Sequence, residues 1–250
     1  MLYEMQLKKP KMIIFDYGHT LCLEDDFDGL RGTEAVMKHA AVNKNNIGAK
    51  EICDFADSLY YGIGGKAHDI DIEIHNLISE KFMYEYLQIE FDLPMAQIER
   101  IFWDSAAPGK AMPNAEKALD YLQARDIRSG VVSNISFSGD NLAGRLNRMF
   151  PKNKFEFIIA SSEYIFRKPH KMIFELALHK AGLTAGDAWF CGDSTKHDIA
   201  GAMNAGIFPV WYHSEIACNY RDPGLDKRPD FDHLYIRDWL ELIDILEKLQ

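Results

Sequence analysis

The sequence lacks the features that define several classes of protein. Its four cysteines (Cys22, Cys53, Cys191 and Cys218) are scattered without CxxC spacing, so we expect neither a zinc site nor a disulfide framework. The apolar run that follows the basic N-terminal residues stops at Asp16, which makes it too short for a signal sequence or a membrane span. We therefore expect a cytoplasmic protein that does not act at a membrane.

Positive charge is also scarce. The chain has 28 Lys and Arg residues against 38 Asp and Glu residues, which gives a formal net charge of −10. A field of this sign repels nucleic-acid backbones and anionic lipid, so we expect no nucleic-acid partner. A small anionic substrate stays possible, because a local cation or metal ion can override the charge of the whole molecule.

Short apolar runs that end at polar residues recur along the chain and alternate with helical patterns. This alternation predicts a doubly wound parallel sheet, in which ligands bind at the carboxyl ends of the strands. The expected strands are Met12–Phe15, 130–132, Phe155–Ala160, 188–191 and 207–212, and the expected helices are 114–124, Lys171–Ala181, 195–205 and 239–249.

One stretch interrupts the alternation. Between residues 24 and 105 the pattern predicts only helices, at 30–43, 49–60, 72–87 and 95–103. Such a run is typical of an inserted helical domain. We therefore predict an α/β core formed by residues 1–22 and 107–250, and an all-helical cap formed by residues 23–106. The glycine-rich stretch 61–68 is predicted to be a flexible cap loop that faces the site, and its Lys66 and His68 are candidate substrate-binding residues.

Two candidate site motifs follow predicted strands: Asp16 follows the first strand, and Ser133 and Asn134 follow the second. Asp16 stands at the tip of the first strand, where its carboxylate can attack phosphorus as a nucleophile, or simply cap a turn. Ser133 and Asn134 follow a later strand, where a hydroxyl and the next backbone N–H can hold phosphoryl oxygens, although a serine there is also an ordinary turn residue.

Two further candidate site motifs lie later in the chain, each at the start of a predicted helix. Lys168 lies next to Pro169 before a helix, where it can neutralise both a nucleophile and a transferring group, or belong to a solvated helix start. Asp193 and Asp198 occur in the run Cys-Gly-Asp-Ser-Thr-Lys-His-Asp, and their hard oxygens near Asp16 suit Mg²⁺. Asp193 can also serve as a helix cap.

The order of the four motifs resembles the haloacid dehalogenase superfamily of hydrolases. The resemblance covers roughly residues 11–22 and 107–215, and the helical insertion corresponds to that superfamily's cap only by its position. It implies that Asp16 attacks phosphorus, that Ser133 holds the phosphoryl group and that Lys168 pairs with Asp16. It also implies that Mg²⁺ is held by Asp16, the carbonyl of Gly18 and Asp193, with Asp198 in support. The expected function is a Mg²⁺-dependent hydrolase that acts on a small phosphorylated metabolite through an aspartyl-phosphate.

One position departs from the family pattern. Family phosphatases usually read Asp-x-Asp-Gly-Thr, and the second aspartate is the general acid and base, but Gly18 stands at that position here and His19 stands where the glycine usually lies. Loss of the acid typically costs roughly 10²–10⁴-fold in rate. Either His19 replaces the acid, or the substrate has a good leaving group, or the protein runs another reaction.

Three alternative functions stay open at this point. Dehalogenation proper needs no metal, so the pair Asp193 and Asp198 argues against it. Phosphonate hydrolysis is a closer rival, because phosphonoacetaldehyde hydrolases have a small residue at the position of Gly18 and use a cap lysine, for which Lys66 is a candidate, although it can equally be a plain surface lysine. A non-catalytic protein that binds a phosphorylated ligand is the third. The pattern fixes neither the physiological substrate nor the oligomeric state.

Overall fold

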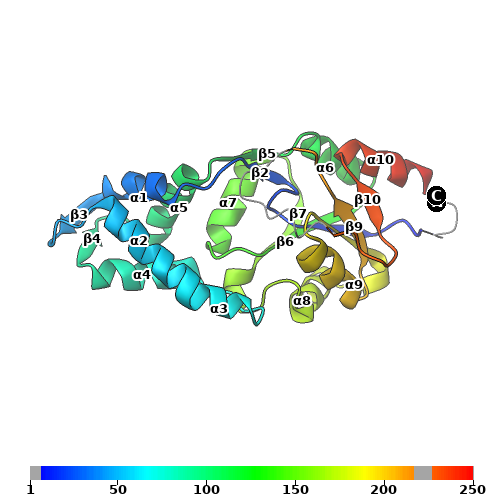
Figure 1. Cartoon of the computed structure of the whole chain (residues 1–250). Coiled ribbons are helices and arrows are strands. Elements are labelled where there is room, and N and C mark those ends of the chain that lie inside the picture. The colour runs from blue at the N-terminus through cyan, green and yellow to red at the C-terminus, as the bar shows by residue number, and fades with distance from the viewer. Residues whose placement is uncertain (1–6, 217–226, 250) are drawn as a thin grey trace.

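The computed structural model describes residues 7–216 and 227–249 (Figure 1). Cys218 and the first six residues, which entered the interpretation above, lie outside these ranges. The larger lobe is built on a six-stranded sheet in the order β10-β9-β8-β1-β6-β7, in which every pairing is parallel. Its strands are β1 (Met12–Phe15), β6 (Arg128–Ser133), β7 (Phe155–Ala160), β8 (Ala188–Gly192), β9 (Phe208–Tyr212) and β10 (Leu234–Ile236).

The two faces of the sheet carry separate apolar cores because side chains alternate along each strand. In β1, Ile13 and Phe15 join one core, and Met12 and Ile14 join the other, all fully buried. The first face is covered by α6 (Ala115–Ala124), α7 (Gly139–Met149) and α10 (Trp239–Lys248), and the second by α8 (Lys171–Ala181) and α9 (Gly201–Asn204). This is the predicted doubly wound α/β architecture.

The register of the central strands brings the polar strand ends to one edge. Phe15, the last residue of β1, pairs with Val131 of β6 on one side and with Cys191 of β8 on the other. Because all three strands are parallel, the residues that follow these pairs emerge together. Asp16, Ser133 and Asp193 therefore gather at the same edge of the sheet.

A second lobe lies at the other end of the molecule in Figure 1. It has its own apolar core, which includes Val36, Ile52 and Ile98. Its helices are α1 (Gly29–Met37), α2 (Ala49–Leu59), α3 (Gly65–His68), α4 (Asn76–Tyr86) and α5 (Met95–Ala106). Where the chain leaves and re-enters the larger lobe, β2 (Cys22–Glu24) pairs with β5 (Gly109–Ala111). We call residues 25–108 the cap and the larger lobe the core.

Several elements of the cap differ from the sequence prediction. The last four residues of the predicted helix 30–43 instead form β3 (Ala40–Asn43), which pairs with β4 (Ile89–Phe91) in an antiparallel ribbon. The predicted loop 61–68 is helical, since a π-helical segment (Tyr60–Gly64) continues α2 into α3. Glycine disfavours helix by only about 1 kcal/mol per residue, which tertiary contacts can outweigh. Here the ring of His68 packs edge-on against that of Tyr60, with 5.7 Å between centroids.

Some elements of the core differ from the sequence prediction. The sequence pattern does not predict α7 and β10. The predicted helix 195–205 begins with a π-helical segment (Thr195–Ala200) before α9. Short 3₁₀ turns complete the chain at Ser161–Glu163 and Ala185–Asp187. No helix among the described residues has the length and apolarity needed to cross a bilayer.

Candidate active site

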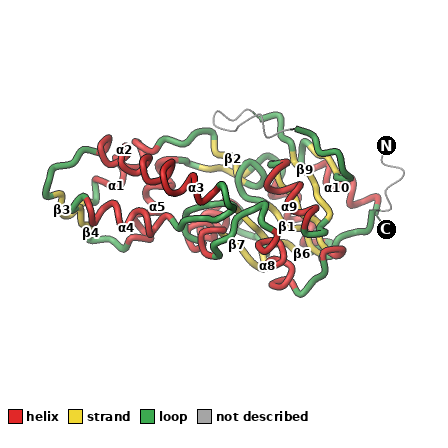
Figure 2. The backbone as a smooth tube through the Cα atoms, turned by 60° about the horizontal axis from the view of Figure 1, so that its bottom comes forward, coloured by secondary structure: helices red, strands yellow, loops and turns green. Residues whose placement is uncertain are grey.

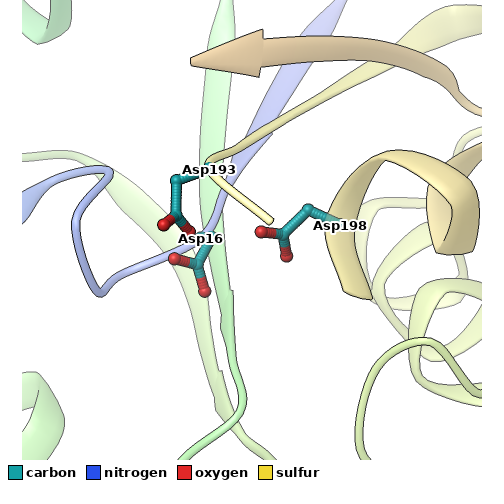
Figure 3. A group of neighbouring side chains, drawn as sticks. All are labelled: Asp16, Asp193 and Asp198. Atoms are coloured by element: carbon teal, nitrogen blue, oxygen red, sulfur yellow. The ribbon is translucent and has the colours of Figure 1, made fainter. Parts of the chain in front are cut away.

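Three aspartates converge at the carboxyl edge of the sheet (Figure 3). Asp16 follows β1, Asp193 follows β8, and Asp198 lies in the π-helical segment after it. One oxygen of each lies within 4.8 Å of the others, and all three residues are at most 9% exposed. Buried carboxylates at this spacing repel one another strongly, so the site needs positive charge to be stable.

Lys168 supplies that charge. Its Nζ donates to Oδ1 of Asp16 and to Oδ1 of Asp198, each at 2.6 Å, and the residue is 1% exposed. Burial alone would lower the pKa of Lys168, but the two carboxylates outweigh burial and raise it, so the side chain stays an ammonium. Burial raises the pKa of Asp16 to about 6, an effect that Lys168 opposes and Asp198 adds to.

Asn134 holds the backbone of this lysine. Its Oδ1 accepts from the N–H of Lys168 at 2.7 Å, and its Nδ2 donates to the carbonyl of Lys168 at 2.8 Å. The predicted role of Asn134 in substrate binding rests on its backbone N–H and stays a prediction, while both ends of its side chain are occupied by Lys168. Ser133, which precedes it, closes β6 next to β1 and is buried.

The loop after β8 is shaped to receive Asp198. Oδ2 of Asp198 accepts from the N–H of Ser194 at 2.9 Å. A Cβ placed on Gly192 would lie 2.3 Å from the carboxyl carbon of Asp198, so only glycine allows this approach. The indole N–H of Trp211 donates to the carbonyl of Asp193 at 3.0 Å and fixes the strand end from the neighbouring β9.

Gly18 and His19 occupy the turn after Asp16. A Cβ placed on Gly18 would meet no atom within 4 Å, so the position has room for a side chain. His19 adopts a left-handed backbone conformation with φ of 53°, which glycine adopts more readily. Its N–H donates to the carbonyl of Cys22 at 2.7 Å, so the turn is closed by the backbone.

The two predicted cap residues have different environments. Lys66 is exposed on α3, whereas a Schiff-base lysine typically lies in a desolvated pocket. Nε2 of His68 lies 2.9 Å from Oε1 of Glu73. Glu73 in turn approaches Arg167, the neighbour of Lys168, at 3.3 Å. The sequence pattern does not single out Glu73, because a single glutamate in a predicted helix carries no signal of a long-range contact.

The donor set fits a hard divalent cation. Asp16 and Asp193 present carboxylate oxygens toward each other in Figure 3, and such oxygens are the ligands that Mg²⁺ prefers. Both oxygens of Asp198 already accept hydrogen bonds from Lys168 and Ser194. Asp198 is thus suited to hold Lys168 and the loop, and the first two aspartates are better placed to bind a metal directly.

Known proteins resemble this chain over different lengths. A pyrimidine 5'-nucleotidase, PynA of Streptococcus pneumoniae, is 25% identical over 249 residues, which cover 96% of this chain and 98% of that protein. A glyceraldehyde 3-phosphate phosphatase of Methanothermobacter thermautotrophicus is 31% identical over 115 residues, but the match covers only 45% of this chain and 49% of that protein.

A solved structure supports the fold. The 2-haloacid dehalogenase of Pseudomonas syringae aligns with a TM-score of 0.61 at 20% identity, and the alignment covers 96% of this chain and 99% of that one. The sequence profile of the haloacid dehalogenase-like hydrolases matches residues 70–211, more than half of the chain. The chain therefore belongs to the haloacid dehalogenase-like hydrolase family.

Proposed function

We propose that this hydrolase is a Mg²⁺-dependent phosphatase that acts on a small phosphorylated metabolite, with Asp16 as the nucleophile. The observation that carries the proposal is the position of Lys168, whose buried ammonium joins Asp16 to Asp198. The relatives named as a nucleotidase and a sugar-phosphate phosphatase support this class of substrate.

In the first step an oxygen of Asp16 attacks phosphorus, and the bond from phosphorus to the leaving oxygen breaks. Lys168 stabilises the charge on Asp16 and on the phosphoryl oxygens, and Ser133 holds the phosphoryl group at the neighbouring strand end. In the second step water attacks the phosphorus of the aspartyl-phosphate, the bond to Asp16 breaks, and inorganic phosphate leaves.

Asp16 and Asp193 would hold Mg²⁺, together with the carbonyl of Gly18. When bound, the ion offsets the repulsion between an anionic nucleophile and an anionic substrate. The carboxylate cluster would otherwise disfavour the approach of phosphate, since Lys168 carries one positive charge among three aspartates.

The proposal is tested with p-nitrophenyl phosphate and the Asp16→Asn variant. We expect activity in Mg²⁺ that falls at least about 10³-fold in Asp16→Asn, because the amide is nearly isosteric but a poor nucleophile. Asp54→Asn, on the exposed face of α2, is the matched control and should keep full activity. EDTA-treated wild type working at full rate would contradict the metal requirement, and an active, folded Asp16→Asn would remove Asp16 from the mechanism.

The same assay separates the alternatives. Release of phosphate from phosphonoacetaldehyde that is lost in Lys66→Ala would favour a phosphonate hydrolase. Tight binding of phosphorylated metabolites without turnover would favour a binding protein. A metal-supplemented screen of phosphorylated metabolites, including acyl phosphates, would identify the substrate.

A further inference from the structure

The tip of the cap docks on the segment that carries the catalytic lysine. Helix α3 points from the cap toward the core in both Figure 1 and Figure 2. Just after it, Ile72 forms an antiparallel bridge with Phe166. The N–H of Glu73 donates to the carbonyl of Ile165 at 2.7 Å, and the N–H of Arg167 donates to the carbonyl of Asp71 at 2.9 Å. Residues 71–73, the cap tip, thus pair with residues 165–167, which lead directly into Lys168.

The side chain of Glu73 reinforces this pairing. Its carboxylate is almost fully buried, with 2% of the side chain exposed. Oε2 accepts from the hydroxyl of Ser161 at 2.8 Å and lies 3.3 Å from Nη1 of Arg167, while Oε1 lies 2.9 Å from Nε2 of His68. Burial raises the pKa of Glu73, but His68, Arg167 and Ser161 more than reverse this, so its pKa lies below the usual value and the group is anionic. The buried carboxylate thus has partners in both lobes, and losing one partner of such a buried charge is costly.

The docked segment is strained. Ile165 has φ of 68°, in the left-handed region that β-branched residues rarely adopt, and its side chain is 62% exposed. Such conformations cost roughly 1–3 kcal/mol and persist where surrounding contacts impose them. The carbonyl of Ile165 is the acceptor for the N–H of Glu73, so the cap tip is one of the contacts that impose this conformation.

We propose that Glu73 is a positioning residue, which on docking of the cap tip fixes residues 165–167 and thereby sets Lys168 between Asp16 and Asp198. The inference rests on the proposed role of Lys168 in catalysis. Glu73 thereby couples the position of the cap to the geometry of the catalytic lysine, because its side chain contacts Arg167, the residue before Lys168. When the cap tip leaves, residues 165–167 lose two backbone hydrogen bonds and one charged partner, and the strain at Ile165 can relax.

The test compares Glu73→Gln with Asp54→Asn, which removes a carboxylate from an exposed pair elsewhere in the cap. Kinetics with p-nitrophenyl phosphate are measured beside amide hydrogen exchange of peptides that cover residues 161–170. In Glu73→Gln we expect kcat to fall roughly tenfold or more with little change in KM. Exchange at the Arg167 amide should rise by a similar factor, and Asp54→Asn should change neither quantity.

A second-site variant separates positioning from general stability. Ile165→Asn keeps the exposed position but tolerates positive φ better, so it should stabilise the docked backbone without the cap tip. We expect it to restore part of the kcat lost in Glu73→Gln, whereas a merely structural defect would not be rescued. If Glu73→Gln fails to fold, Glu73→Asp keeps the charge on a shorter side chain and should show smaller changes of the same sign.

Two other outcomes in Glu73→Gln would overturn the proposal. Unchanged kcat with faster exchange would show that the cap tip does not act on Lys168. Reduced kcat with unchanged exchange would show that Glu73 affects kcat without holding residues 165–167. If the wild type hydrolyses no phosphate ester, the proposed function fails by itself. The exchange comparison then still decides whether Glu73 holds residues 165–167, and unchanged exchange overturns the inference.

Discussion

At the scale of single residues, Asn134 makes contacts that its neighbours in the sequence do not suggest. It follows Ser133, so the pattern predicts that its backbone N–H binds phosphoryl oxygens. The structure adds that its side chain holds the backbone of Lys168 at two atoms. We expect Asn134→Ala to lower kcat about tenfold or more, because Lys168 loses its fixed backbone, and to change KM little. Steady-state kinetics on p-nitrophenyl phosphate check this.

The exposed Asn147 of α7 gives the control for that measurement. Asn147→Ala should leave both constants unchanged. If Asn134→Ala instead raises KM and the inhibition constant of inorganic phosphate while kcat stays constant, then the side chain of Asn134 binds substrate.

Gly18 is the residue at which this chain departs most from its family's pattern. A Cβ there meets nothing within 4 Å, so the first atom of an introduced aspartate side chain displaces no neighbour. Without an acid at this position, alkyl phosphates should react slowly and aryl or acyl phosphates should lose less, because their leaving oxygens depart unprotonated. We expect a steep dependence of kcat/KM, which reports the step that expels the leaving group, on leaving-group pKa in the wild type, and a flatter one in Gly18→Asp.

His19 is the competing source of the proton in that series. If it acts as the acid, the wild-type profile is flat and becomes steep in His19→Ala. A flat profile that responds to neither variant would contradict the missing-acid interpretation. Slow hydrolysis of the aspartyl-phosphate should also produce a burst of p-nitrophenol in the wild type.

At the scale of elements, strands were more predictable than helices of mixed composition. The apolar run Met12–Phe15 predicts a buried strand of a parallel sheet, and the structure places it in the interior of the sheet. Helix α7 was missed because it contains two glycines, two asparagines and only a short apolar stripe formed by Leu142 and Leu146. Conversely, the glycines of the stretch 61–68 suggested a loop, but the helical hydrogen bonds of α2 continue through them.

Helix α4 contains a carboxyl group, that of Glu80, whose protonation should change the free energy of unfolding with pH. Burial, with Glu99 of α5 as the next cause, raises the pKa of Glu80 from 4.5 to about 8. The folded protein therefore binds more protons than the unfolded chain between these pH values, and the free energy of unfolding falls as pH rises through that range. The contribution is on the order of a few kcal/mol, since one pKa unit corresponds to about 1.4 kcal/mol.

Replacing Glu80 by glutamine should remove this pH dependence. Glu80→Gln mimics the protonated acid, so we expect a Tm close to that of the wild type at pH 5 and higher by about 4 °C or more at pH 8.5. Glu85→Gln, which changes an exposed carboxylate of the same helix, should alter neither value. A Glu80→Gln variant that is less stable than the wild type at pH 8.5 would show that the carboxylate is ionised and favourably paired.

At the scale of the whole molecule, the sequence predicts the site better than it predicts the contacts around it. Asp16, Lys168 and Asp193 follow strand ends or precede a helix, so the topology of a parallel sheet suffices to bring them together. The contacts between the cap and the core include single polar side chains such as Glu73 and Glu99. Glu99 is fully buried and accepts from the N–H and hydroxyl of Ser138 at the start of α7. No local pattern distinguishes such glutamates from those that face solvent.

The carboxylate cluster also links metal binding to the stability of the whole chain. A cation that binds the folded protein alone raises the free energy of unfolding by about 1.4 kcal/mol at ten times its dissociation constant. For a chain of this length, that corresponds to a rise in Tm of about 4 °C. We expect Mg²⁺ to produce such a rise in the wild type, and KCl of equal ionic strength to produce none. In Asp193→Asn the rise should disappear, because the variant loses a carboxylate that faces Asp16 but keeps the Lys168 contacts. Differential scanning calorimetry across a Mg²⁺ titration checks this. An equal rise in Tm in both proteins would place the cation elsewhere on the chain, because a net charge of −10 attracts cations over the whole surface.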